Sequence, residues 1–151
     1  MIDFHNHVLP NIDDGSKSMD MSLDMIRYAA EQGITDVVNT VHYQHPKVVT
    51  ENISYQRIRR ELQKLQLELD RNNISVKLHA GAEVFFLPNL SEIRVDPLAT
   101  FANGKYMLIE FQVHQIPEIQ KQELFDLKMA GVTPIIAHPE RYKQVQDSIE
   151  F

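Results

Sequence analysis

The sequence contains no cysteine. Disulfide bonds, thiolate-bound zinc sites and cysteine nucleophiles are therefore excluded. No apolar run approaches the roughly 20 residues that a membrane-spanning helix needs. The first residues also lack the basic start and the long apolar run of a signal peptide. These absences predict a cytoplasmic protein without membrane insertion.

Positive charge is scarce as well: 15 Lys and Arg stand against 21 Asp and Glu, which gives a formal net charge of -6. No basic stripe stands out, so nucleic acid is a poor candidate for a partner. An acidic protein that handles phosphate has to concentrate positive charge locally, and bound metal ions are one way to do so. The length of 151 residues and the hydrophobic content of 43% fit one domain with one core.

Strand and helix patterns alternate along the chain. Short apolar runs predict strands over residues 1–4, 34–41, 74–78, 105–111 and 132–137. Amphipathic segments predict helices over residues 19–32, 51–72 and 118–130. This alternation is typical of a parallel α/β fold, which binds ligands beyond the carboxyl ends of its strands. Metal-binding side chains are therefore expected to gather at the strand ends.

The first predicted strand ends in two histidines, His5 and His7. Their spacing of two places both rings on one side, where they can bind one ion. The alternative is a pair of solvated histidines near the terminus. The sequence Asp13-Asp14-Gly15 follows and is typical of a turn. Two acids so soon after the histidine pair favour Asp14 as a further ligand.

The next predicted strands also end in metal-binding residue types. His42 ends the second strand, and His45 follows shortly after. We expect one of these two rings to point into the site and select His42, which is closer to the strand end. Glu83 follows the third strand. Glu110 lies in an apolar strand, where a buried carboxylate needs a partner. That partner is a metal ion or, alternatively, a buried Arg or Lys.

His138 ends the last predicted strand, and Arg141 lies just beyond it. Arg141 can hold phosphate oxygens through two parallel hydrogen bonds, although a surface arginine at a helix start is the alternative. The seven candidate ligands are too many for one catalytic ion, which favours two or three ions that share a carboxylate. Mixed imidazole and carboxylate ligands suit Mn²⁺, Fe or Zn²⁺ better than Mg²⁺ or Ca²⁺. Such a centre hydrolyses phosphate esters.

The order of these motifs resembles the PHP (polymerase and histidinol phosphatase) superfamily. The most similar branch is the manganese-dependent tyrosine-protein phosphatases of bacterial capsule and exopolysaccharide loci. The matching segments are residues 2–15, 22–25, 81–83, 108–111 and 134–141. The resemblance implies a distorted TIM-like (β/α)7 barrel with a trinuclear Mn²⁺ centre. It also implies hydrolysis of phosphotyrosine on a tyrosine kinase that controls polysaccharide synthesis.

The resemblance further implies a role for each candidate residue. Glu83 bridges two ions, and Arg141 contacts the substrate phosphate. The remaining ligands form three pairs, one for each ion: His5 with His7, Glu110 with His138, and Asp14 with His42.

Two features depart from the family pattern. Val41-His42-Tyr43 stands where relatives have two histidines, or a histidine and an arginine. Family members also continue well beyond this length and supply a late Asp-x-His pair. We therefore expect residues 1–151 to form a single PHP domain that is incomplete at its C-terminus and self-associates through an open sheet edge. Two other functions stay open: a small-molecule phosphoesterase similar to histidinol phosphatase, and an inactive metal-binding remnant.

Overall fold

The computed structural model describes residues 1–48 and 53–148 and contains one parallel sheet. Its strands are β1 (Ile2–Asn6), β2 (Asp36–Tyr43), β3 (Lys77–Phe85), β4 (Tyr106–Glu110) and β5 (Thr133–Ile136). They lie side by side in chain order, β1-β2-β3-β4-β5. This order differs from that of a doubly wound sheet, which reverses its strand order. The predicted parallel α/β arrangement is confirmed.

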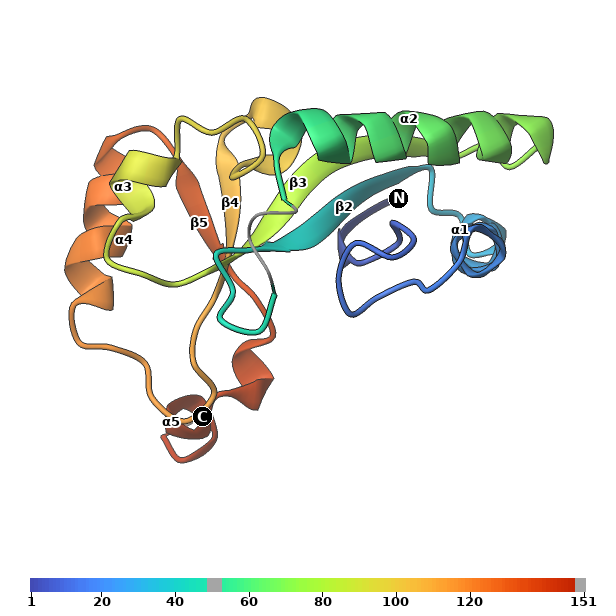
Figure 1. The fold of residues 1–151 in the computed structure, drawn as a ribbon. Helices are drawn as coiled ribbons and strands as arrows, with labels where there is room; N and C mark the ends of the chain where they lie inside the picture. Colours follow the sequence, from blue (N-terminus) through green and yellow to red (C-terminus); the bar gives the residue numbers. More distant parts are fainter. Residues whose placement is uncertain (49–52, 149–151) are drawn as a thin grey trace.

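Helices connect the strands and surround one side of the curved sheet (Figure 1). The α-helices are α1 (Met19–Glu31), α2 (Tyr55–Arg71), α3 (Leu90–Ile93), α4 (Gln120–Met129) and α5 (Lys143–Gln146). Two short 3-10 helices, η2 (Phe101–Asn103) and η3 (Pro139–Arg141), complete the described elements. No helix in the described ranges is long and apolar enough to cross a membrane.

The core lies between the sheet and the helices on its outer side. The apolar stripe predicted for α2 is confirmed, since Ile58, Leu62, Leu65 and Leu69 are all buried. They pack with strand residues that include Ala82 of β3. Burying each such aliphatic side chain contributes about 1.5–3 kcal/mol to folding.

The opposite face of the sheet carries polar side chains toward its carboxyl end. His42 of β2 is the register partner of Glu83 in β3, and Phe85 is that of Glu110 in β4. Val41 and Ala82, one residue earlier in each strand, belong to the core. Because side chains alternate along a strand, His42 and Glu83 point away from that core. The fold therefore places an imidazole and a carboxylate side by side.

Two predicted element positions are wrong. The third strand begins at Lys77 rather than Ile74, because Ile74 closes the end of α2, where its backbone N–H donates to Leu69 O. Glu83 consequently lies inside β3 instead of following it. The second strand begins at Asp36, after Ile34 has closed α1 in the same way.

The predicted start of the second helix at residue 51 lies outside the described residues. The helix itself begins at Tyr55, directly after Ser54, whose side chain accepts a hydrogen bond from Arg57 N. Ser18 caps α1 in the same manner through Met21 N, as its sequence position predicts.

Candidate metal centre

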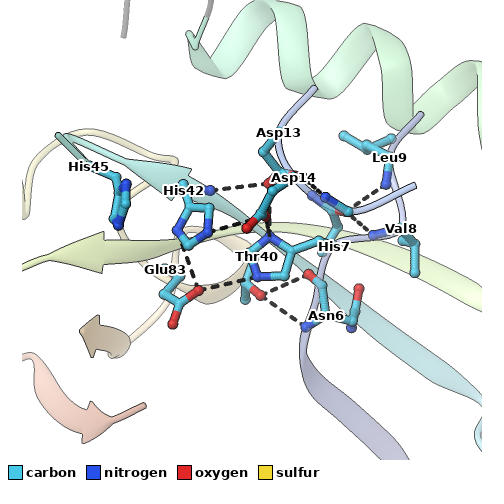
Figure 2. A network of polar contacts seen from close by, with 12 residues as sticks. Asn6, His7, Val8, Leu9, Asp13, Asp14, Thr40, His42, His45 and Glu83 are labelled. Carbon is cyan, nitrogen blue, oxygen red and sulfur yellow. Dashed lines mark hydrogen bonds and ion pairs between the residues drawn. The ribbon is translucent and has the colours of Figure 1, made fainter. Parts of the chain in front are cut away.

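The segment after β1 is fastened to β2 by two buried polar side chains. Asn39 Oδ1 accepts hydrogen bonds from the backbone N–H groups of Val8 and Leu9, both at 3.1 Å. Thr40 Oγ1 accepts from Asn6 N at 3.0 Å and donates to Asn6 O at 2.9 Å. These bonds, shown in Figure 2, fix the direction of the chain that carries the first two histidines.

The loop that contains Asp13, Asp14 and Gly15 packs against His7. A β-carbon at Gly15 would lie 2.1 Å from His7 O, so only glycine fits there, and Ser16 N donates to the same oxygen at 3.0 Å. The close approach brings both acids of the loop to the site. Asp13 Oδ2 lies 2.8 Å from His7 Nδ1. Asp14, with an exposed side chain, lies next to the second-strand histidine at the edge of the site.

Glu83 is the centre of the cluster. Its Oε1 lies 3.1 Å from His5 Nε2 and 2.9 Å from His138 Nε2. Its Oε2 lies 3.2 Å from His7 Nε2 and 3.5 Å from His42 Nδ1. The side chain is 2% exposed. Each carboxylate oxygen thus faces two imidazole nitrogens, which suits a carboxylate shared between two cations.

Glu110, the last residue of β4, is surrounded by histidines. Its carboxylate oxygens lie 3.6 Å from His138 Nε2, 3.7 Å from His42 Nδ1 and 3.5 Å from His45 Nε2. Within the described part of the chain, no Lys or Arg forms an ion pair with Glu110, although the charge of Arg141 lowers the pKa of this carboxyl from further away. Glu110 Oε2 and His42 Nδ1 are both buried without a hydrogen-bond partner. Buried polar atoms left unpaired indicate a missing ligand or ion.

His42 lines the pocket as selected, but the expectation that only one of the two rings does so is wrong, because His45 lines it as well. Gln44 between them has a positive φ of 49°, and this left-handed turn brings the His45 ring back toward the pocket. Burial lowers the pKa of both rings, which favours their neutral forms. Sequence reasoning also missed Lys47, a third residue of this turn region that lines the pocket.

Opposite charges are concentrated in the cluster. Burial disfavours the charged ring of His7, but its hydrogen bonds with Asp13 and Glu83 raise the pKa to about 10. Burial likewise opposes ionisation of Glu83, yet the hydrogen bonds from His5 and His7 hold its pKa well below its usual range. Burial raises the pKa of Glu110 to about 7, and the charge of Glu83 adds to this effect. The carboxylates therefore need positive partners, which protons or metal ions can supply.

All eight residues selected from the sequence line one pocket of about 630 Å³. Their donor atoms form groups with separations within 4.8 Å: His5, Glu83 and His138; His7, Asp14 and His42; and His42, Glu110 and the additional His45. This grouping joins His5 to His138, whereas the family resemblance pairs it with His7. Glu83 occurs in one of these groups and His42 in two, whereas the family resemblance makes Glu83 the carboxylate that two ions share. The assignment of ligands to ions stays a prediction.

Tyr142 ties together the two strand ends that carry Glu110 and His138. Its buried hydroxyl accepts from Phe111 N at 3.0 Å and donates to Ala137 O at 2.8 Å. The Tyr142→Phe variant should lose about 1–3 kcal/mol of unfolding free energy, because both backbone groups lose their partner. Urea unfolding of the metal-free protein measures this loss.

The matched control is Tyr106→Phe, at a residue that is 52% exposed. It should stay within about 0.5 kcal/mol of the parent chain. Equal unfolding free energies for the two variants would show that the Tyr142 hydroxyl does not hold the strand ends.

A family model described as "Capsular polysaccharide synthesis, CpsB/CapC" matches residues 1–151. Among curated proteins, the chain is 30% identical over 149 residues to tyrosine-protein phosphatase YwqE of Bacillus subtilis, covering 98% of this chain and 58% of YwqE. It is 28% identical over 157 residues to tyrosine-protein phosphatase CpsB of Streptococcus agalactiae, covering 99% of this chain and 61% of that protein. The chain thus spans about three fifths of the length of these relatives.

A comparison with solved structures shows that the fold, too, is similar to that of such proteins. The crystal structures of YwqE from Bacillus subtilis and CpsB from Streptococcus pneumoniae, described as unique metal-dependent tyrosine phosphatases, include a chain that matches with a TM-score of 0.89. The identity is 30%, and the match covers 97% of this chain and 59% of the solved one. The curved five-stranded parallel sheet is therefore shared with these proteins.

Proposed function

The chain belongs to the CpsB/CapC family of capsular polysaccharide synthesis, and we propose that it is a metal-dependent protein-tyrosine phosphatase. We further propose that residues 1–151 form a domain of PHP type, part of a TIM-like barrel, with Mn²⁺ as the ion. The substrate proposed is phosphotyrosine on a bacterial tyrosine kinase of polysaccharide synthesis. The observation that carries the proposal is Glu83, whose two buried oxygens each face two imidazole nitrogens.

The residues present fit such a centre. Imidazole and carboxylate donors surround the pocket, and the unpaired buried atoms Glu110 Oε2 and His42 Nδ1 point to a missing positive partner. The proposed holders of two or three ions are His5, His7, Asp14, His42, Glu83, Glu110 and His138. Bound divalent ions supply a hydroxide nucleophile at neutral pH and neutralise charge on phosphoryl oxygens.

The remaining pocket residues act on the substrate and on the ligands. Arg141, on η3, and Lys47 both line the pocket, so two cationic side chains border the space that holds the ligand cluster. The Arg141 backbone N–H donates to His138 O at 2.9 Å, which ties its position to a candidate ligand. A guanidinium in this place can bind two phosphoryl oxygens at once.

We therefore expect Arg141→Ala to raise KM for aryl phosphates about 10-fold or more while the metal content stays unchanged, because a charge-assisted contact is worth about 1.5–3 kcal/mol. Arg141→Lys should recover only part of this loss, since an ammonium group lacks the planar fork. Steady-state kinetics combined with elemental analysis measure both effects. Loss of bound metal in Arg141→Ala would assign a structural role to the side chain instead.

The function itself is tested by chelation and reloading. The purified chain is stripped with a chelator, reloaded with Mn²⁺, Fe²⁺ or Zn²⁺, and assayed for phosphate release from a phosphotyrosine peptide. We expect no turnover in the stripped protein, recovery in proportion to bound ion, and preference for phosphotyrosine over phosphoserine. Turnover of small alkyl phosphates alone would indicate a small-molecule phosphoesterase. Bound metal without any turnover would indicate a metal-binding protein that is not an enzyme in this form.

A further inference from the structure

A second pocket of about 490 Å³ opens directly beside the candidate metal centre. The two pockets share His45, Lys47 and Glu110 as a common wall. A molecule whose phosphate lies among the ligands therefore has its esterified group next to this second space. Its volume falls within the range of pockets that bind small molecules.

The walls of the second pocket are largely apolar. Pro46, Phe85, Phe111 and Val113 contribute the apolar part, and Gln112 and His114 complete the lining outside the shared wall. Phe85 lies two residues after Glu83 on the same face of β3, so the apolar wall is built into the strand that carries the central carboxylate. Val113 is 40% exposed although it is aliphatic, and its carbonyl accepts from Lys143 N at 3.1 Å, which anchors the segment. An anchored, solvent-facing apolar wall beside a charged site is typical of a ligand contact.

His45 stands at the junction of the two pockets. Its Nδ1 accepts a hydrogen bond from Lys47 N at 3.2 Å, so the neutral ring carries its proton on Nε2. The ring meets Phe85 edge-on, with centroids 5.2 Å apart and an interplanar angle of 85°. Nε2–H faces the carboxylate cluster, 3.5 Å from Glu110 Oε2. In this tautomer, His45 is placed to donate a hydrogen bond from Nε2 to a substrate oxygen.

We propose that this second pocket binds the aromatic ring of an aryl phosphate ester, with His45 donating a hydrogen bond to an oxygen of the ester. The proposal rests on the proposed phosphatase function and names the feature that selects its substrate. An aromatic ring buries a large apolar area against Phe85 and Val113 and can pack edge-to-face with Phe85. The single side-chain carbon of phosphoserine offers no such area, so an aliphatic ester gains little from these walls.

The test measures binding of two non-hydrolysable probes to the Mn²⁺-loaded chain by calorimetry: phenylphosphonate and methylphosphonate. The parent chain should bind phenylphosphonate about 10-fold tighter, because the ring buries apolar area in addition to the shared phosphonate contacts. Val113→Ser and Phe85→Leu should each lower affinity for phenylphosphonate about 3-fold to 10-fold. Their affinity for methylphosphonate should stay unchanged, which also shows that the variants are folded and loaded.

The matched control is Val95→Ser, since Val95 is 74% exposed and lies outside both pockets. It should leave both affinities unchanged. Equal affinity of the parent chain for the two phosphonates would overturn the aryl pocket and leave a metal-dependent phosphoesterase standing. An equal loss for both probes in Val113→Ser and Phe85→Leu would overturn it as well. Failure of the metal-loaded parent to bind either phosphonate would overturn the proposed function together with this inference.

Discussion

Glu83→Gln should empty the metal centre and lower turnover by about 10³-fold or more, the equivalent of several kcal/mol of charge stabilisation. Both oxygens of Glu83 face imidazole nitrogens, so both are engaged in the site. A glutamine has the same shape but carries no charge and only one acceptor oxygen. Any ion on the amide nitrogen side loses its ligand, and an ion on the oxygen side loses the negative charge that neutralised it.

Three measurements on the purified variant decide this outcome. Elemental analysis counts bound Mn²⁺, a phosphotyrosine peptide reports turnover, and thermal unfolding of the metal-free protein reports folding. Glu92→Gln on α3 is the matched control, because Glu92 is exposed and lies outside the pocket. It should retain the parent's metal content and rate. A Glu83→Gln chain that keeps the full complement of ions would show that Glu83 does not bridge them.

The sequence was enough to predict that the candidate ligands lie close together, because parallel strands end at one edge of their sheet. Each candidate ligand except Asp14, which comes from a loop, follows or ends an apolar segment, and alternation decides which face a residue takes. Glu110 is the plainest case, since a carboxylate after three apolar residues of β4 must meet a partner at the edge of the core. The rule required no knowledge of the turns that follow each strand.

The turns explain what the sequence did not reveal. His45 enters the pocket only because Gln44 adopts a positive φ, and glutamine gives no sign of that conformation. The alternation of Ile74 and Val76 indicated a strand, but these residues are buried in the irregular connection between α2 and β3. The segment after a helix and the start of a strand can both bury apolar residues spaced two positions apart. This spacing therefore does not distinguish the two structures.

Gly81 shows a similar limit within β3. A β-carbon there would lie 2.8 Å from Val38 Cγ1 and 3.1 Å from Phe101 Cδ1. The glycine is required because Val38 of β2 and Phe101 of η2 both pack closely against it, yet glycine in a sequence usually signals a turn. The contact with residue 101 comes from 20 positions further along the chain, which local patterns do not reach.

Asp13→Asn should weaken Mn²⁺ binding about 10-fold to 100-fold without removing any ligand, the usual cost of losing the carboxylate that orients a metal-binding histidine. Burial opposes ionisation of Asp13, but the hydrogen bond from His7 keeps its pKa below the usual value. Its Oδ2 accepts from His7 Nδ1 at 2.8 Å and from His42 N at 3.3 Å, and its Oδ1 accepts from Gly15 N at 3.1 Å. Both oxygens therefore face donors.

An asparagine at this position must turn its NH₂ group toward at least one of those donors. If the NH₂ group faces His7, the ring loses its hydrogen-bond acceptor. That acceptor holds the proton on Nδ1 and so keeps Nε2 free to bind metal. If the NH₂ group faces Gly15, the loop that carries Asp14 loses its anchor instead. Either orientation disturbs the site next to Glu83, whereas the ligand atoms themselves are all retained. The defect should therefore be one of affinity and not of stoichiometry.

Titration of the metal-free chain with Mn²⁺ against a chelating dye separates these two quantities. Asp13→Asn should reach the parent's number of bound ions at saturating Mn²⁺, with a dissociation constant about 10-fold to 100-fold higher. Asp126→Asn, on the exposed surface of α4, is the matched control and should bind like the parent. An unchanged dissociation constant in Asp13→Asn would mean that His7 is oriented by the fold alone. Loss of an ion even at saturation would make Asp13 a ligand in its own right.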